Sequence, residues 1–312
     1  MLDAPSKALF HGLAQVPALQ RLASRYGMAK GSGFARRFIA GESILEALAA
    51  VRDLPAKQLH LTLDYLGESV SSADAAAAAA AEYVGIFDAI VASGVERNIS
   101  LKLTQLGLDV DRATAIDNMR RILEPADHYG FFVRIDMEGS LYTEVTLSVL
   151  ETLWQQGHRQ IGTVIQSCLK RSDGDIRRLN ALGARVRLVK GAYKEPKTVA
   201  FQNKTDVDAA FVDLMRLLLD AGHYPAIATH DPAMIAATKA FVRERGYAQD
   251  RFEFQMLYGI RRDLQAALVA EGYTVRVYVP FGRQWYPYFM RRLGERPANV
   301  AFVLKGILTD RG

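Results

Sequence analysis

The side chains best suited to chemistry gather near the end of the chain, around an adjacent pair of arginines. Pro287 fits the first turn of a helix, where its missing N–H costs nothing. From there Tyr288, Arg291, Arg292 and Glu295 recur at i, i+3, i+4 and i+7, which puts all four on one helix face. Two arginines on the same stripe as a tyrosine can bind a carboxylate or phosphate through paired hydrogen bonds. The alternative interpretation of this stripe is a salt-bridged helix on the outer surface.

Polar residues also stand inside or just after short apolar segments that have the composition of strands. These residues are Lys102, Asp136, Gln166, Arg187, Thr229, His230, Gln255 and Tyr278. A charged side chain in such a segment is costly unless it is paired, so it requires a partner or a ligand. For Lys102 and Asp136 two interpretations stay open: an internal ion pair, or a pair that also meets a substrate. His230 suits a cap or a cofactor contact, and no second histidine is spaced to complete a metal site with it.

Eight strand-like segments alternate with helical ones after residue 57. They cover residues 60–66, 99–106, 131–137, 162–169, 186–192, 224–229, 252–257 and 275–279. The intervening segments carry helix signals, such as the alanine run 75–81, and a helix over 173–182 that Gly183 ends. This alternation implies parallel strands joined by right-handed crossovers, and eight strands close a barrel. The sequence therefore predicts a (β/α)8 TIM-like barrel over residues 58–312, preceded by an N-terminal helical arm over residues 1–57.

A doubly wound open sheet is the competing fold. Its dinucleotide site needs G-x-G-x-x-G after a first strand, whereas Gly31 and Gly33 have no strand before them and no third glycine in register. In a barrel the catalytic groups project from the carboxyl ends of the strands, where the polar residues fall. Alternation along the fifth strand puts Arg187 and Gly191 on one face and Lys190 on the other, so both cations cannot point into the lumen. Gly191 leaves room for a flat ligand near the backbone.

The composition restricts the class of protein. The 39 basic and 34 acidic residues are spread along the chain, which does not make a nucleic-acid-binding surface. Cys168 is the single cysteine, so no internal disulfide forms, and its apolar surroundings favour a structural thiol. No stretch approaches the ~18 uninterrupted apolar residues of a membrane span. The N-terminus lacks the pattern of a secretory signal, so we expect a cytoplasmic protein.

Together these segments resemble the proline dehydrogenase family. The matching pieces are residues 63–68, 100–104, 134–138, 187–193, 229–230 and 253–257, and the long stretch 278–295. The chain resembles the short, monofunctional bacterial members, because it leaves no room after the barrel for the aldehyde dehydrogenase domain of the bifunctional ones. The resemblance implies that the protein binds FAD and oxidises L-proline to Δ1-pyrroline-5-carboxylate, with hydride passing from proline C5 to flavin N5.

The resemblance also implies roles for individual residues, with Asp136 and Arg187 as the catalytic ones. Lys102, Arg291 and Arg292 would hold the proline carboxylate, and Tyr278, Tyr288, Tyr193 and Leu257 would contact its ring. Asp136 would bond to Tyr278, and Arg187 would stabilise the reduced flavin near N5. The residues that would contact FAD are Met137, Gln166, Arg187, Lys190, Gly191, Ala192, Thr229, His230 and Glu295. The acceptor of the substrate amine proton stays open between water and Asp136.

The resemblance further implies a quinone as electron acceptor and a separate pyrroline-5-carboxylate dehydrogenase for the next oxidation. A basic stretch favours peripheral contact with anionic lipid on the inner face of the cell membrane, through Arg21, Arg25, Lys30, Arg36 and Arg37. From the residues alone two other functions stay open. One is a Schiff-base aldolase with Lys102 or Lys190 as nucleophile, and the other is a silent barrel that only binds an anion.

Overall fold

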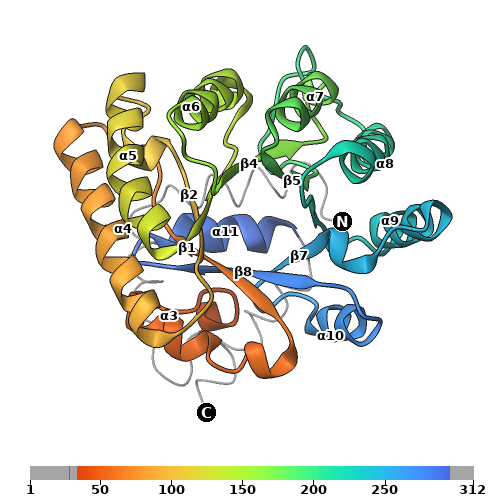
Figure 1. The fold of residues 1–312 in the computed structure, drawn as a ribbon, viewed down its shortest axis with the longest axis horizontal. Helices are drawn as coiled ribbons and strands as arrows, with labels where there is room; N and C mark the ends of the chain where they lie inside the picture. Colours follow the sequence, from red (N-terminus) through yellow and green to blue (C-terminus); the bar gives the residue numbers. More distant parts are fainter. Residues whose placement is uncertain (1–27, 29–33, 296–312) are drawn as a thin grey trace.

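The computed structural model describes Met28 and residues 34–295. Within these residues eight parallel strands close into a barrel in sequence order, and helices surround it (Figure 1). The strands are β1 (His60–Tyr65), β2 (Asn98–Leu101), β3 (Phe132–Ile135), β4 (Ile161–Gln166), β5 (Arg185–Val189), β6 (Ala226–Ala228), β7 (Glu253–Leu257) and β8 (Val275–Phe281). Strand β8 closes the barrel on β1, with His60 opposite Arg276 and Tyr65 opposite Phe281. The predicted (β/α)8 barrel is confirmed.

The outer layer follows local sequence signals. Its helices are α4 (Ala73–Ser93), α5 (Arg112–Tyr129), α6 (Thr143–Gln155), α7 (Ser172–Leu182), α8 (Lys204–Ala221), α9 (Pro232–Arg245) and α10 (Arg262–Ala270). The side chains of Ser72 and Asp111 cap α4 and α5 by accepting hydrogen bonds from backbone N–H groups. Gly94 and Gly183 end α4 and α7 in the left-handed conformation, which glycine adopts without strain. Capping residues in the sequence therefore mark where the crossover helices begin and end.

Strands β1 to β6 end earlier than the apolar runs predicted, whereas β7 ends at Leu257 as predicted and β8 continues to Phe281. The expected strand 99–106 is wrong beyond Leu101, because the chain turns there into a 3-10 helix, η3 (Thr104–Leu106). Asp136 lies one residue beyond β3, and its N–H donates to the carbonyl of Leu101 at 2.8 Å. Lys102 and Asp136 consequently stand at the tips of neighbouring strands. They belong to the mouth of the barrel, where a charged side chain can reach a ligand.

The lower part of the barrel lumen is filled by charged side chains. Arg276 Nε lies 2.9 and 3.0 Å from the two carboxylate oxygens of Glu253, and its Nη1 donates to Glu96 at 2.7 Å. Arg134 donates to the carbonyl oxygens of Thr163 and Arg185 at 3.1 and 3.0 Å. Branched apolar residues more commonly fill such layers. These paired groups close the lumen below the mouth and support the residues above them.

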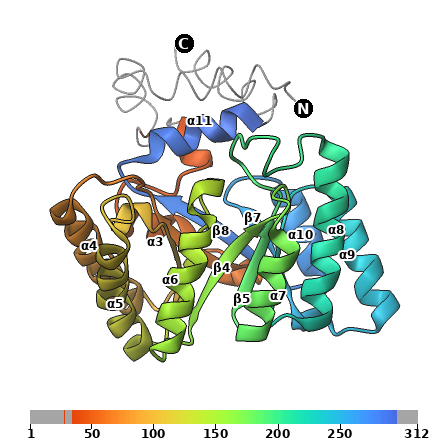
Figure 2. The same cartoon turned by 90° about the horizontal axis from the view of Figure 1, so that it is seen from above.

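A second apolar cluster fastens a helix across the carboxyl end of the barrel. The last described helix, α11 (Trp285–Glu295), lies over the strand ends (Figure 2). Trp285 and Phe289 pack with Phe38 and Ile39, which follow the 3-10 helix η1 (Phe34–Arg37). The backbone approaches closely here, since a Cβ on Gly259 would lie 1.7 Å from the Arg37 carbonyl oxygen. This part of the N-terminal arm therefore holds α11 in place.

The rest of the described arm consists of α3 (Ile44–Val51), capped by Ser43, and the 3-10 helix η2 (Pro55–Lys57). Residues 1–27 and 29–33 of the predicted helical arm lie outside the described residues, and the domain boundary at residue 57 stays a prediction. Two further 3-10 helices, η4 (Ser140–Tyr142) and η5 (Gln249–Arg251), precede α6 and β7. All of these short elements connect or cap the barrel units.

Helix α4 is long and apolar enough to cross a membrane by length and composition, with a mean hydropathy of 1.5 over its most apolar window. It has the position of an ordinary barrel helix, however. Its buried face, which includes Tyr83, Ile86, Phe87 and Ile90, belongs to the main hydrophobic core. Core helices of soluble domains can have the same length and composition, so these properties do not indicate that α4 spans a membrane.

Candidate active site

The mouth of the barrel contains a buried lysine between two aspartates. Lys102 Nζ lies 3.7 Å from Asp64 Oδ1 and 4.0 Å from Asp136 Oδ2. Burial by itself would lower the pKa of Lys102, but the two carboxylates raise it, and its net pKa lies above the ordinary value. Lys102 is therefore a cation at neutral pH. The internal ion pair that was one interpretation of Lys102 and Asp136 is present, and Asp64 is an additional member.

Asp136 links two further residues expected at the site. Its Oδ1 accepts from Arg187 Nη1 at 2.7 Å, and its Oδ2 accepts from the Tyr278 hydroxyl at 2.8 Å. Arg187 also donates to Gln255 Oε1 and Ser100 Oγ, and its guanidinium lies 5.1 Å from the Tyr278 ring centroid. Burial and the nearby aspartates raise the pKa of Tyr278 well above its ordinary value, so the phenol stays protonated. This network holds Arg187 in one orientation.

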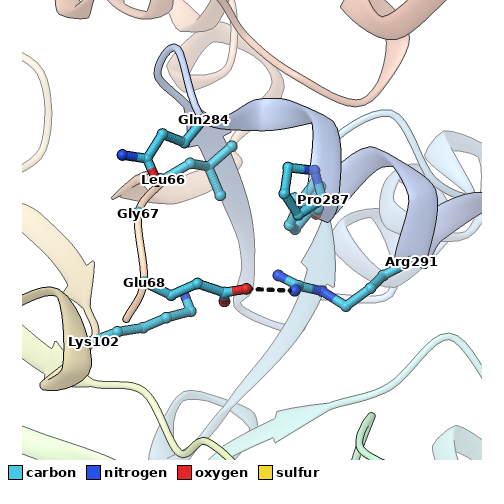
Figure 3. A pocket seen from close by; sticks show the side chains of 8 residues that line it. Leu66, Gly67, Glu68, Lys102, Gln284, Pro287 and Arg291 are labelled. Carbon is cyan, nitrogen blue, oxygen red and sulfur yellow. Dashed lines mark hydrogen bonds and ion pairs between the residues drawn. The ribbon is translucent and has the colours of Figure 1, made fainter. Parts of the chain in front are cut away.

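Helix α11 brings its arginines over this network. Arg291 Nη1 donates to Glu68 Oε1 at 3.0 Å across a pocket that Lys102 and Tyr288 also line (Figure 3). The outer-helix interpretation is wrong for Arg291, since its side chain is only 20% exposed and faces the pocket. Arg292 lies with its guanidinium carbon 5.1 Å from the Tyr288 ring centroid. The side chain of Glu295, the last member of the predicted stripe, lies outside the described residues.

Tyr193 and Leu257 lie at the same mouth. Burial raises the pKa of Tyr193 to about 12, although the positive charges of Lys102 and Arg291 act in the opposite direction. Leu257 ends β7 and packs against the apolar cluster under α11. Its backbone N–H donates to His230 Nε2 at 2.9 Å, which assigns the acceptor nitrogen of that ring. Aromatic and apolar walls thus accompany the charges.

The segment after β5 lies beside Gln166. Gly191 has φ +108°, and a Cβ there would lie 2.4 Å from Cys168 Sγ and 3.2 Å from Gln166 Oε1. Gln166 Nε2 donates to the Glu138 carbonyl at 3.0 Å, which orients its Oε1. Gly191 and Ala192 are exposed, whereas Met137 is buried. Only glycine fits at position 191 without displacing its neighbours.

Cys168 itself behaves as the structural thiol expected from the sequence. It is half-buried, and burial raises its pKa to about 11. A protonated thiol is a poor nucleophile.

Lys190 and Arg187 separate as the strand alternation predicted. Arg187 points into the lumen, whereas Lys190 Nζ lies beside Asp208 of α8 and Asp231, the N-cap of α9. Thr229 is buried next to them, and its hydroxyl accepts from the Asp231 N–H at 3.0 Å. Lys102 is consequently the lysine that reaches the lumen. Lys190 stands at the rim, near the N-terminus of a helix.

The structure adds two acidic residues, Asp64 and Glu68, for which the sequence predicted no role. Both lie in the segment 63–68 that resembles the family, and Asp64, like Asp136, is a charge within an apolar strand-like segment. Among the described residues, no group of three or more histidine, cysteine or acidic side chains is arranged to hold a metal ion.

A (β/α)8 barrel whose mouth combines buried cations, tyrosines and a covering helix is an enzyme fold suited to a small anionic substrate. Comparisons with known proteins identify the family. The family model described as Proline dehydrogenase matches residues 47–305. Proline dehydrogenase 1 of Bacillus subtilis strain 168 is 46% identical over 300 residues, covering 96% of this chain and 98% of its own. Proline dehydrogenase of Deinococcus radiodurans is 43% identical over 312 residues, covering 99% of both chains.

Longer relatives match over the same barrel. Bifunctional protein PutA of Escherichia coli strain K12 is 31% identical, over 86% of this chain and 24% of that protein. A crystal structure of proline utilization A from Bdellovibrio bacteriovorus, inactivated by N-propargylglycine, has a TM-score of 0.78 and 27% identity, covering 84% of this chain and 32% of that one. The chain thus spans about a third or less of these PutA proteins.

The chain belongs to the proline dehydrogenase family. It is an FAD-dependent enzyme that oxidises proline to Δ1-pyrroline-5-carboxylate. The aldolase and the silent barrel are therefore wrong as functions.

Proposed function

We propose that the cations at the mouth bind the carboxylate of L-proline, with Lys102 below and Arg291 and Arg292 on α11 above. The observation that carries this proposal is the position of Arg291 and Lys102 on the walls of one pocket. Arginine binds a carboxylate through two parallel hydrogen bonds, which fixes direction as well as position. Arg291 is paired with Glu68. A bound carboxylate would compete with Glu68 for the same guanidinium.

The ring of proline would lie between Tyr278, Tyr288, Tyr193 and Leu257. Burial raises the pKa of Tyr278 and Tyr193 further above neutrality, so both stay protonated phenols beside a bound substrate. Orienting a bound substrate for reaction is worth up to ~7–11 kcal/mol in principle. These rigid walls supply orientation at little cost in side-chain entropy.

The residues around Gln166 and Gly191 fit the isoalloxazine end of FAD. Exposed backbone at Gly191 and Ala192, an oriented Gln166 amide and the buried Met137 make a surface for a flat ring. FAD held there would supply the acceptor for the hydride that leaves proline C5. Arg187 would stabilise negative charge on the reduced ring, because Asp136, Gln255 and Ser100 already fix its direction.

The phosphate-bearing end of FAD would meet Lys190, Thr229 and His230. Lys190 stands at the N-terminal end of α9, and helix N-termini favour anions. Glu295 remains a proposed contact on α11.

Asp136 is proposed as a residue that orients Arg187 and Tyr278 and not as the base for the substrate amine. Both of its carboxylate oxygens already accept hydrogen bonds, from Arg187 and from Tyr278. Accepting a proton would remove the negative charge that strengthens both of these contacts. Water therefore has more support as the first acceptor of the amine proton.

We propose a quinone as the electron acceptor and a separate pyrroline-5-carboxylate dehydrogenase as the enzyme of the next oxidation. The proposed location is the cytoplasmic face of the membrane. Arg37 is exposed near α11, and Arg36 is paired with Glu46, whereas Arg21, Arg25 and Lys30 lie outside the described residues. Sedimentation with anionic vesicles tests the contact, and neutral vesicles are the control.

A spectrum of the purified protein tests the site as a whole. Proline added without an acceptor should bleach the flavin absorption. In the Arg292→Lys variant the flavin should bleach only at higher proline concentrations, because lysine does not reproduce the paired hydrogen bonds of arginine. An unchanged concentration dependence would contradict the carboxylate role of Arg292.

A further inference from the structure

Asp64 is a buried carboxylate at the active site that the proposed function does not use. It lies near the end of β1 with no exposed surface. Among the described residues neither of its oxygens has a hydrogen-bond partner, and Lys102 Nζ, at 3.7 Å, is its ion-pair partner. A buried carboxylate without such support is destabilising, so its position calls for an explanation.

The two aspartates beside Lys102 differ in what else they contact. Asp136 shares its charge between Arg187 and Tyr278, and it lies 4.0 Å from the lysine. The Tyr278 hydroxyl also faces Asp64, but it donates to Asp136. Among the described residues, Lys102 is therefore the one cation that lies within 4.0 Å of Asp64.

Lys102 needs a close anion in order to act as a cation in this position. It is 7% exposed, and loss of hydration favours the neutral amine. The charged or titratable groups that face it come from several elements: Asp64 on β1, Glu68 after β1, Asp136 and Glu138 after β3, Tyr193 after β5, and Tyr278 on β8. Arg187 and Arg291 lie beside this group and add positive charge.

Glu68 pairs with Arg291, and Glu138 accepts from the Thr104 hydroxyl at 2.6 Å. Because Glu68 and Glu138 already have these partners, each carboxylate stabilises the Lys102 ammonium less. Among the described residues, Asp64 is the carboxylate closest to the Lys102 ammonium, and its oxygens accept no hydrogen bond.

We propose that Asp64 is a positioning residue that keeps Lys102 charged and in place to bind the carboxylate of proline. The inference rests on the proposed carboxylate role of Lys102. A substrate carboxylate would approach the ammonium from the pocket side, where Lys102 lines the wall (Figure 3). Asp64 would hold it from the strand side. An apolar residue in place of Asp64 would leave the lysine to share Asp136 with two other donors.

Asp64→Asn tests this role, because it removes the charge and keeps the volume. We expect the proline KM of the variant, relative to wild type, to be within threefold at pH 6.5 and at least tenfold higher at pH 9, as Lys102 loses its proton. The kcat should change less than threefold. Thr62→Val is the matched control, since Thr62 is a buried residue on the same strand and its hydroxyl is hydrogen-bonded to Ser100 Oγ. The KM ratio of this control to wild type should not vary with pH.

A double-mutant cycle separates the possible results. Lys102→Met should raise KM at both pH values, and adding Asp64→Asn to it should change KM less than twofold, because Asp64 acts through Lys102. If Lys102→Met leaves KM unchanged, the carboxylate role of Lys102 is wrong and the inference fails with it. If Lys102→Met raises KM but the effect of Asp64→Asn is independent of pH or additive, the inference alone is overturned.

Asp64→Glu gives a second measurement if the asparagine variant does not fold, as judged by FAD content and thermal unfolding. It keeps the negative charge, so its KM ratio to wild type should be flat between pH 6.5 and pH 9. A ratio that rises tenfold over that range would overturn the proposal.

Discussion

Replacing Asp136 should disable the enzyme by releasing Arg187 and Tyr278 together. The Asp136 side chain is 13% exposed and that of Arg187 is 5% exposed, so solvent does not compensate for a lost contact. A hydrogen bond to a charged group contributes about 1.5–3 kcal/mol. Asp136→Asn keeps one acceptor oxygen and loses the charge, which predicts a loss of kcat/KM of about 10- to 150-fold at 1.4 kcal/mol per tenfold. Asp136→Ala loses both contacts, and about 3–5 kcal/mol is the scale for breaking a buried charge pair.

Steady-state kinetics and stopped-flow bleaching of the flavin by proline measure this effect. Asp109→Asn is the matched control, because Asp109 also accepts from a tyrosine hydroxyl, that of Tyr142 at 2.7 Å, but is exposed. The control should stay within twofold of wild type. If Asp136→Ala retained wild-type kcat/KM with normal FAD content, Arg187 would not depend on this carboxylate, and the mechanism drawn from the network would be wrong.

Three further predictions concern substrate, cofactor and pH. Arg292→Lys should raise the proline KM at least tenfold with FAD still bound, and an unchanged KM in steady-state assays would refute the paired contact. Gly191→Ala should weaken FAD binding at least tenfold in fluorescence titrations, whereas Gly157→Ala, with a similar φ of +102° but open space at its Cβ, should not; equal effects would rule out the steric explanation. Glu96 is hydrogen-bonded to His60 and Arg276, which hold its pKa at about 2 despite burial. Its stabilising contribution is therefore present above pH 4.5 and is lost as the pH falls toward 2; Glu96→Gln should flatten acid unfolding in that range, and an unchanged profile would contradict the assignment.

Much of the fold was accessible from local patterns. Strand segments and the glycine that ends a helix act over a few residues, and the structure contains the strands and the helix end at Gly183 near where they were expected. The carboxyl ends of the strands were less accessible. The predicted strand 99–106 failed after Leu101, because the turn into η3 depends on Glu138, a residue from the next strand unit, which binds Thr104.

The residues of the candidate site were also only partly predictable from the sequence. Residue type and spacing identified Lys102, Asp136 and Arg187, because a charge within an apolar strand is unusual in any sequence. Asp64 is also a charge within an apolar strand, but no role was predicted for it. Asp64 and Asp136 differ in burial and in their contacts, and these depend on the registers of β1, β2 and β3.

The sequence by itself determined that the chain forms an eight-stranded barrel with polar residues at the carboxyl ends of its strands, because periodicity and capping are local properties. Only the tertiary structure decided which of those residues meet. Pairing of β1 with β2 places Lys102 beside Asp64, and the apolar cluster under α11 brings Arg291 to Glu68. Such pairs join residues from separate strands or from opposite ends of the chain, and their geometry depends on strand register and helix docking, which no local pattern encodes.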